Sequence, residues 1–252
     1  MHLAAIHRHP IKALGTEPLE RADLRAGETL PGDREWALAH ARTPFDPAAP
    51  AWTRCTAFLR GATFPTLMAV TAETRPDGAL TLRHPSAEIT ADPRTPEGEV
   101  AILAFAAGLL PETAPRPVRL ARVPGRGMTD SPEPTVSILS DASRRALSEH
   151  AGRALDRRRF RGNLWLDGLG PWAEFDWIGR HVRLGGAVLA VTEPIGRCSA
   201  THADPETGRR DLDLLALLES RLGHTDFGVM AEVVESGPVA RGDAPELLPR
   251  AA

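Results

Sequence analysis

Residues 182–192 read VRLGGAVLAVT. This stretch holds two short apolar runs, Val182–Leu184 and Ala187–Thr192, on either side of Gly185-Gly186. Short aliphatic and β-branched runs around such a turn are typical of paired β-strands. Val229–Val234 follows as another apolar run and predicts a further strand. The second half of the chain is therefore expected to be rich in β-structure.

The first half of the chain shows the same pattern of short strands and turns. Residues 3–8 and 34–39 have strand-like composition. The turn Pro76-Asp77-Gly78 separates two alternating runs, 68–72 and 80–83, which predicts a hairpin. Strands of this length, recurring along both halves, favour a barrel-like β architecture.

Helix signals are few. Thr95 followed by a proline can cap a helix that includes Val100–Leu110. Ser140 can cap another that runs to about residue 151, and Asp211–Leu222 places most of its leucines on one helical face. The expected fold class is mainly β with some helices, an α+β chain.

A connector divides the chain. Residues 111–134 contain six prolines together with Gly125 and Gly127, a composition that suits an irregular segment. We therefore expect a first domain over residues 1–115 and a second over residues 116–250.

Composition excludes several classes of protein. The formal charge of −3 gives no overall basic field, so nucleic acid is not an expected partner. No run approaches the roughly 18 apolar residues that span a bilayer, and the N-terminus lacks a signal-peptide pattern. Cys55 and Cys198 are far apart in sequence and are interpreted as reduced thiols. We expect a cytoplasmic protein that is not bound to a membrane and acts as a monomer.

The segment Pro194–Gly208 carries the most chemical information. Cys198 follows a predicted strand and precedes a turn rich in residues that cap backbone groups. An adjacent arginine, Arg197, favours the thiolate, which is both a nucleophile and a soft metal ligand. From the residues alone both chemistries stay open, as does an inert buried thiol. A small metal site of Cys198, His202 and Asp204, or a cysteine hydrolase, is a weaker alternative because structural zinc usually has four ligands.

Several strings spread along nearly the whole chain resemble the MOSC family, which includes the C-terminal domain of molybdenum cofactor sulfurase and the amidoxime-reducing component. The matching strings are Pro10-Ile11-Lys12 with Gly15, Leu30–Leu38, Arg159–Leu164, Trp172-Ala173-Glu174, Trp177-Ile178-Gly179, the cysteine segment through Gly208, Gly223-His224, Phe227-Gly228 and Gly242-Asp243. Their common order and spacing carry the resemblance.

The resemblance implies a MOSC β-barrel domain joined to an N-terminal β-barrel-like domain, with a molybdenum pterin cofactor in the cleft between them. Cys198 would be the protein sulfur on the metal and the catalytic residue. The expected cofactor-binding residues are Lys12, Arg34, Ser140, Arg161, Asn163 and Arg197. Arginine and lysine suit the cofactor phosphate, and Lys12 is the single lysine in a chain with 29 arginines. Asn163 suits a pterin edge, although it is equally suited to stabilising its own turn.

The activity implied by the resemblance is the reduction of small N-hydroxylated compounds. Two cysteines cannot supply the four thiolates of an iron–sulfur cluster, so electrons are expected from a separate electron-transfer protein. The alternative is a carrier that delivers the cofactor or activated sulfur, with Cys198 as the sulfur acceptor. The chain departs from reductase-type members at Ala13, where several have serine, and at Met230, where such members often have an aromatic hydroxyl.

Overall fold

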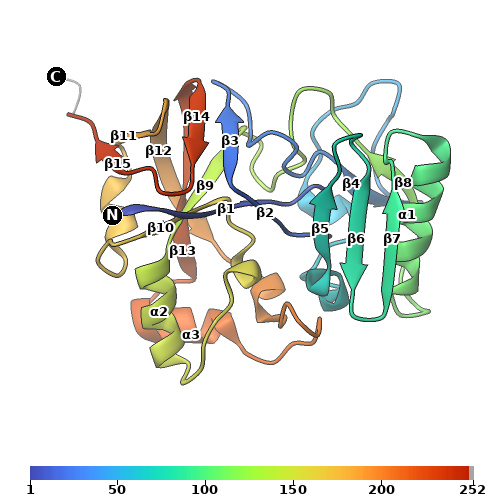
Figure 1. Cartoon of the computed structure of the whole chain (residues 1–252). Helices are drawn as coiled ribbons and strands as arrows, with labels where there is room; N and C mark the ends of the chain where they lie inside the picture. The colour runs from blue at the N-terminus through green and yellow to red at the C-terminus, as the bar shows by residue number, and fades with distance from the viewer. Residues whose placement is uncertain (250–252) are drawn as a thin grey trace.

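The computed structural model describes residues 1–249 and shows a mainly β protein with three α-helices among these residues (Figure 1). The fold class expected from the sequence is confirmed. The largest unit is a curled eight-stranded sheet. In spatial order its strands are β15 (Pro245–Leu247), β11 (His181–Leu184), β12 (Ala187–Gly196), β13 (Asp226–Glu235), β9 (Val136–Ser140), β10 (Leu164–Asp167), β1 (His2–Arg8) and β2 (Glu17–Leu19). None of the helices within residues 1–249 has both the length and the apolar character needed to cross a membrane.

The hairpin predicted from residues 182–192 is confirmed as β11 and β12. The strands are antiparallel, and Leu184 is the partner of Ala187 across the turn. Gly185 has a φ of +54°, and a side chain there would collide with the carbonyl of Pro238. Glycine is therefore required both by its backbone conformation and by the close approach of the neighbouring strand. The predicted strand Val229–Val234 lies within β13, which pairs with β12.

Two helices pack against each other on one side of this sheet. These are α2 (Asp141–His150) and α3 (Leu214–Leu222), which lie together below the sheet in Figure 1. Helix α2 connects β9 to β10, which are the one parallel pair of the sheet. Helix α3 begins three residues later than predicted, because the Asp213 carboxylate accepts a hydrogen bond from the Ala216 amide at 3.0 Å and so caps the helix there.

The first half of the chain builds a separate cluster at the opposite end of the molecule (Figure 1). It contains the three-stranded antiparallel sheet β5 (Thr71–Thr74), β6 (Leu80–His84) and β7 (Ala87–Ala91), the helix α1 (Pro96–Gly108), and the pair β4 (Ala37–His40) and β8 (Pro117–Ala121). The predicted hairpin turn and the Thr95 cap are both confirmed, the latter by a 3.0 Å bond from the Gly98 amide. The strand expected over 34–39 begins only at Ala37, because Arg34 has a left-handed φ of +49°.

The two ends of the molecule are joined by the start of the chain. Strand β1 lies between β10 and β2 in the large sheet, and β3 (Arg21–Leu24) pairs with β14 (Gly237–Ala240). The first strands therefore pair with elements of the second half. The boundary expected between residues 115 and 116 falls just before β8, which pairs back to β4, and it stays a prediction. Residue 250 lies outside the described residues.

Five short 3-10 helices occupy connecting segments. They are η1 (Cys55–Ala57), η2 (Pro65–Ala69), η3 (Arg157–Phe160), η4 (Ala173–Trp177) and η5 (Ser199–His202). Four of them, η1, η2, η3 and η5, contribute residues to the cavity described next.

Candidate functional site

A cavity of about 600 Å³ lies where the segments of the two halves meet. Its wall contains six basic side chains but only two carboxylates. The basic residues are Lys12, Arg34, Arg60, Arg159, Arg161 and Arg197, and the acidic ones are Asp130 and Glu193. The size is within the usual range for a small-molecule or cofactor site. Although the chain is slightly acidic overall, this cavity has a local excess of positive charge.

Lys12 lies buried in the wall of the cavity rather than on an open surface. Its ammonium donates to the carbonyl of Met128 at 2.8 Å and forms an ion pair with Asp130. Both partners belong to the irregular connector that the sequence predicted. Desolvation alone would raise the pKa of Asp130, but the charge and hydrogen bond of Lys12, together with the charges of Arg34 and Arg161, outweigh this effect and lower it. The single lysine is therefore already neutralised by the chain itself.

Arg34 and Arg161 meet at the cavity wall and hold each other in place. Arg34 donates to the carbonyl of Arg161 at 2.8 Å and forms an ion pair with its neighbour Asp33. Arg161 donates only to backbone carbonyls, those of Gly15 and Ile11, both at 3.3 Å. No carboxylate within residues 1–249 forms an ion pair with Arg161. Burial, with a further contribution from the Arg34 charge, lowers the pKa of Arg161 to about 9.

The backbone at this wall is strained. Four non-glycine residues in the described chain have a positive φ, and three of them line the cavity. These are Ala13 at +66°, Arg34 at +49° and Arg161 at +47°. Such conformations cost about 1–2 kcal/mol each and are concentrated at functional sites. The folded chain therefore bears an energetic cost to hold these three residues at the cavity.

Arg197 lies on the other side of the cavity, next to Cys198. Its guanidinium donates to the carbonyls of Phe227 and Phe160, each at 2.8 Å, and lies within 6 Å of both aromatic rings. Burial lowers the pKa of Arg197 to about 9, while the nearby Cys198 charge opposes this shift. In the described part of the chain Arg197, like Arg161, has no carboxylate partner. Arg60 also lines the cavity without an ion pair among the described residues, so three partly buried positive charges face it without a counter-ion.

Cys198 presents an exposed thiol at this cavity. It lies two residues after the end of β12 and immediately before η5, in keeping with the strand and turn that the sequence predicted. Its carbonyl accepts hydrogen bonds from the Thr201 amide at 3.1 Å and the Thr201 hydroxyl at 2.8 Å. The inert buried thiol is therefore excluded. No cluster of three or more His, Cys, Asp or Glu residues within residues 1–249 is placed to hold a metal ion, which argues against the alternative site with His202 and Asp204.

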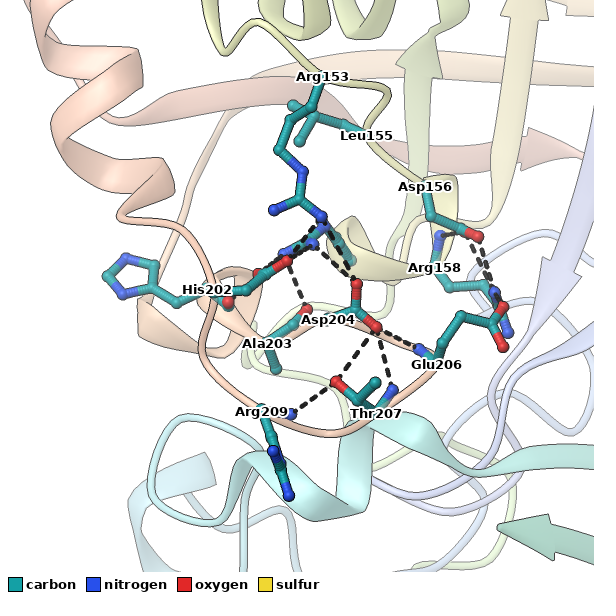
Figure 2. A network of polar contacts seen from close by, with 12 residues as sticks. Arg153, Leu155, Asp156, Arg158, His202, Ala203, Asp204, Glu206, Thr207 and Arg209 are labelled. Atoms are coloured by element: carbon teal, nitrogen blue, oxygen red, sulfur yellow. Dashed lines mark hydrogen bonds and ion pairs between the residues drawn. The ribbon is translucent and has the colours of Figure 1, made fainter. Parts of the chain in front are cut away.

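A network of ion pairs holds the loop that follows Cys198 (Figure 2). Arg159, which is buried, makes two 2.8 Å bonds to Asp211 and a longer contact of 3.4 Å to Asp204. Arg153 reaches Asp211 at 2.9 Å. Asp204 also accepts the Glu206 amide at 2.8 Å, closing the turn visible in Figure 2. These contacts connect η3 to the loop and fix the position of the segment that carries the thiol.

Asn163 and Ser140, two of the expected cofactor-binding residues, have hydrogen-bond partners within the chain. Asn163 lines the cavity, but its amide oxygen accepts from the Ser137 hydroxyl at 2.9 Å and its nitrogen donates to the His7 carbonyl at 3.2 Å. It therefore connects β1 to β9. Ser140 is buried, does not line the cavity, and caps α2 by accepting the Ser143 amide at 3.3 Å. The structure thus brings Lys12, Arg34, Arg161, Asn163, Arg197 and Cys198 together but leaves Ser140 outside.

Several cavity residues were missed by sequence reasoning. Cys55 is half-buried in the same wall. The only feature that marked it in the sequence was that the chain has just two cysteines. Glu193 also lines the cavity and forms no ion pair within the described residues. Ala13 and Met230, the two departures from reductase-type relatives, both face the cavity as well.

These features define a two-part β protein with a basic cavity and a free thiol at its centre. Two family descriptions match it: the MOSC N-terminal beta barrel domain over residues 1–103 and the MOSC domain over residues 126–246. Together they cover nearly the whole chain. The chain therefore belongs to the MOSC family.

Solved structures show partial similarity. The YuaD protein from Bacillus subtilis is 12% identical, with 98% of this chain and 94% of that chain covered and a TM-score of 0.47. YiiM from Geobacillus stearothermophilus is 21% identical over 46% of this chain and 54% of its own length, with a TM-score of 0.37. YiiM from Escherichia coli is 22% identical over 46% and 55%, with a TM-score of 0.35. The match thus spans about half the length of each YiiM. A comparison with curated proteins found no match.

Proposed function

We propose that the cavity binds a molybdenum pterin cofactor, with Cys198 as the sulfur ligand, and that the loaded protein reduces N-hydroxylated compounds. One observation carries the proposal. Arg161 and Arg197, two partly buried guanidiniums with no carboxylate partner among residues 1–249, face the same cavity as the exposed thiol. An anionic cofactor that carries a metal with affinity for thiolate would satisfy both features, because its negative charge would pair with the arginines and its metal would bind the thiol.

The donors of the cavity fit this cofactor. A guanidinium binds phosphate through paired, charge-assisted hydrogen bonds, and Arg161 and Arg197 supply two such groups. A thiolate is a soft ligand and suits a metal already bound by sulfur. Asn163 offers little to the pterin, because the structure commits its amide oxygen to Ser137.

When bound, the cofactor would supply the two-electron chemistry needed to reduce an N–O bond. The chain itself would bind and orient the cofactor and enclose the substrate. The contacts of Arg159 with Asp211 hold the thiol loop in place, and Arg197 places a positive charge beside Cys198. Pro194, Ile195 and Met230 supply apolar walls that would exclude water from part of the cavity.

Glu193 would contact the polar groups of the substrate. It follows Thr192 on β12 and is the register partner of Met230 on β13. A carboxylate without an ion-pair partner favours substrates that carry positive charge or several N–H donors. N-hydroxylated amidines and guanidines have this character.

Electrons would come from a separate redox protein, because the chain has only two cysteines and they cannot ligate an iron–sulfur cluster. Cytoplasmic location and a monomeric state remain part of the proposal. The second candidate, a carrier of cofactor or sulfur, is favoured by the exposure of Cys198. An accessible thiol suits a sulfur acceptor that must pass its sulfur to another protein.

The two functions are separated by one experiment. The protein is produced in a host that makes the cofactor, and molybdenum and pterin are measured in the wild type and in Cys198→Ala. A reductase retains the metal and turns over hydroxylamine-type compounds with an artificial electron donor. Full metal loading without turnover indicates the carrier. If neither metal nor pterin accompanies the wild-type chain, the reductase and the cofactor carrier both fail, and only the transfer of sulfur by Cys198 is left.

A further inference from the structure

The two cysteines of the chain line the same cavity. Cys55 belongs to η1 in the first half, and Cys198 follows β12 in the second half. Both are free thiols, Cys198 exposed and Cys55 half-buried. The proposed function uses only Cys198 and gives Cys55 no role.

The segments that follow each cysteine are held against one another. The carbonyl of Ala62 accepts hydrogen bonds from the Ser199 hydroxyl at 3.4 Å and from the Arg210 guanidinium at 2.5 Å. Gly61 lies at the same contact, where a side-chain carbon would come within 3.5 Å of that of Ala200, an ordinary contact distance. The loop of Cys198 is thereby packed on the segment that begins a few residues after Cys55.

The segment that precedes Cys55 has little regular secondary structure, so the position of Cys55 can shift. Residues 41–54 contain turns but no helix or strand. Segments with so few regular hydrogen bonds open and shift at low energetic cost. Small movements of the Cys55 side are therefore easier than movements of the Cys198 side, which is fixed by the contacts of Arg159.

The two sulfurs also sense each other electrostatically. Burial raises the pKa of the Cys55 thiol, and the negative charges of Asp130 and Cys198 add to this effect, partly opposed by Lys12 and Arg60. Cys55 is therefore mostly a neutral thiol, while the exposed Cys198 is the sulfur that solutes reach first.

We propose that Cys198 and Cys55 form an intramolecular disulfide when the cofactor-free protein meets a peroxide. The Cys198 thiolate attacks the peroxide, so that an S–O bond forms, the O–O bond breaks, and hydroxide leaves and takes up a proton. Cys55 then attacks the resulting sulfenic sulfur as its thiolate: the S–S bond forms and the S–O bond breaks, with release of a second water. In total, two thiols lose two electrons and one hydrogen peroxide becomes two waters.

The consequence for cofactor loading rests on the proposed function, whereas the disulfide does not. A sulfur held in a disulfide cannot ligate a metal, so the oxidised chain would be closed to the cofactor until a thiol reductant reopened it. The pairing would also prevent irreversible oxidation of Cys198 beyond the sulfenic acid.

The test uses the full cofactor-free chain and hydrogen peroxide. After treatment, we expect both free thiols to disappear in a thiol-reagent titration, with both recovered on reduction. Intact mass should show a monomer that has lost two hydrogen atoms, and peptide mapping should find Cys55 linked to Cys198. In Cys55→Ser, Cys198 should instead be captured as a sulfenic acid by dimedone.

Two results overturn the inference. The first is a wild-type chain that stops at sulfenic or higher acids on Cys198 with no link to Cys55. The second is a disulfide that appears only between chains. Because the wild type is itself measured, a folding defect in Cys55→Ser leaves the test intact. Failure of the proposed function would show separately, as absence of molybdenum from reduced protein.

Discussion

Three of the cations in the wall of the cavity, Lys12, Arg161 and Arg197, differ in the partners that surround their charges. Lys12 has a carboxylate partner in Asp130, while within the described part of the chain the two arginines donate only to backbone carbonyls. Backbone carbonyls satisfy N–H groups without cancelling their charge. The single lysine of the chain is thus already neutralised, and the charge available to an anion lies with the arginines.

Cys198→Ala has the largest expected effect. It tests whether the metal binds at the part of the cavity wall that carries Arg197 and Cys198. We expect loss of the bound metal and of all turnover, since no other described cysteine but the half-buried Cys55 lines the cavity. Stability should stay within about 0.5 kcal/mol, because the thiol is exposed. Metal analysis and thermal unfolding check this, with Cys55→Ala as the matched control that should retain the metal.

Arg161→Gln tests the unneutralised charge directly. We expect affinity for inorganic pyrophosphate, measured by calorimetry on the cofactor-free chain, to fall about 10-fold to 100-fold, which is about 1.4–2.8 kcal/mol. The exposed Arg145, paired with Asp167 and remote from the cavity, provides the control. Equal losses in Arg145→Gln and Arg161→Gln would contradict a specific anion site.

The affinity for pyrophosphate should also depend on pH through the charges of Arg161 and Arg197. The pKa values of Arg161 and Arg197 are lowered to about 9, so their charge is lost as pH rises through that value. We expect anion affinity to be steady at pH 7–8 and to fall above about 9, by up to about tenfold per pH unit for each of the two groups. The effect on folding has the opposite sign. Between about 9 and the ordinary arginine value the unfolded chain binds more protons, so these two groups raise the free energy of unfolding as pH rises.

Asp130→Asn removes the neutralising partner and should make Lys12 resemble the arginines. Anion affinity is expected to rise by up to about fivefold, because the lysine charge becomes available to the ligand. Calorimetry with pyrophosphate measures the change. Adding Lys12→Met to Asp130→Asn should abolish the gain, and a gain that survives this second substitution would point to another cause.

Glu193→Gln has the smallest expected effect and concerns the other carboxylate of the wall. KM should rise about threefold for cationic N-hydroxylated guanidines and stay unchanged for a neutral hydroxamic acid, with similar kcat for both. Steady-state kinetics on the metal-loaded protein measures this. A parallel change for both substrates would remove Glu193 from substrate selection.

Local sequence signals predicted most of the fold because their causes are local. The glycines between β11 and β12, the turn before β6 and the Thr95 cap each act within a few residues, and the structure confirms them. Helix α3 was misplaced at its start because its cap, Asp213, is one of two nearby acids that look alike in sequence.

The site was only partly predictable because its shape depends on contacts between distant segments. The resemblance to the family identified five basic or sulfur-bearing residues that do meet at the cavity, Lys12, Arg34, Arg161, Arg197 and Cys198. It could not show that Asn163 is committed to His7 and Ser137, or that Ser140 faces a helix. Cys55 and Glu193 enter the cavity only through tertiary packing, for which no local pattern exists.

The place of β1 inside the large sheet bears on how the protein is made. This strand is synthesised well before its partner β10, which lies far along the chain. Until then, an apolar strand with unpaired backbone groups must wait in a partly folded chain, a state prone to association with other chains. Cooperative folding of the two halves, with a late closure of β1 onto β10, is therefore the expected order of assembly.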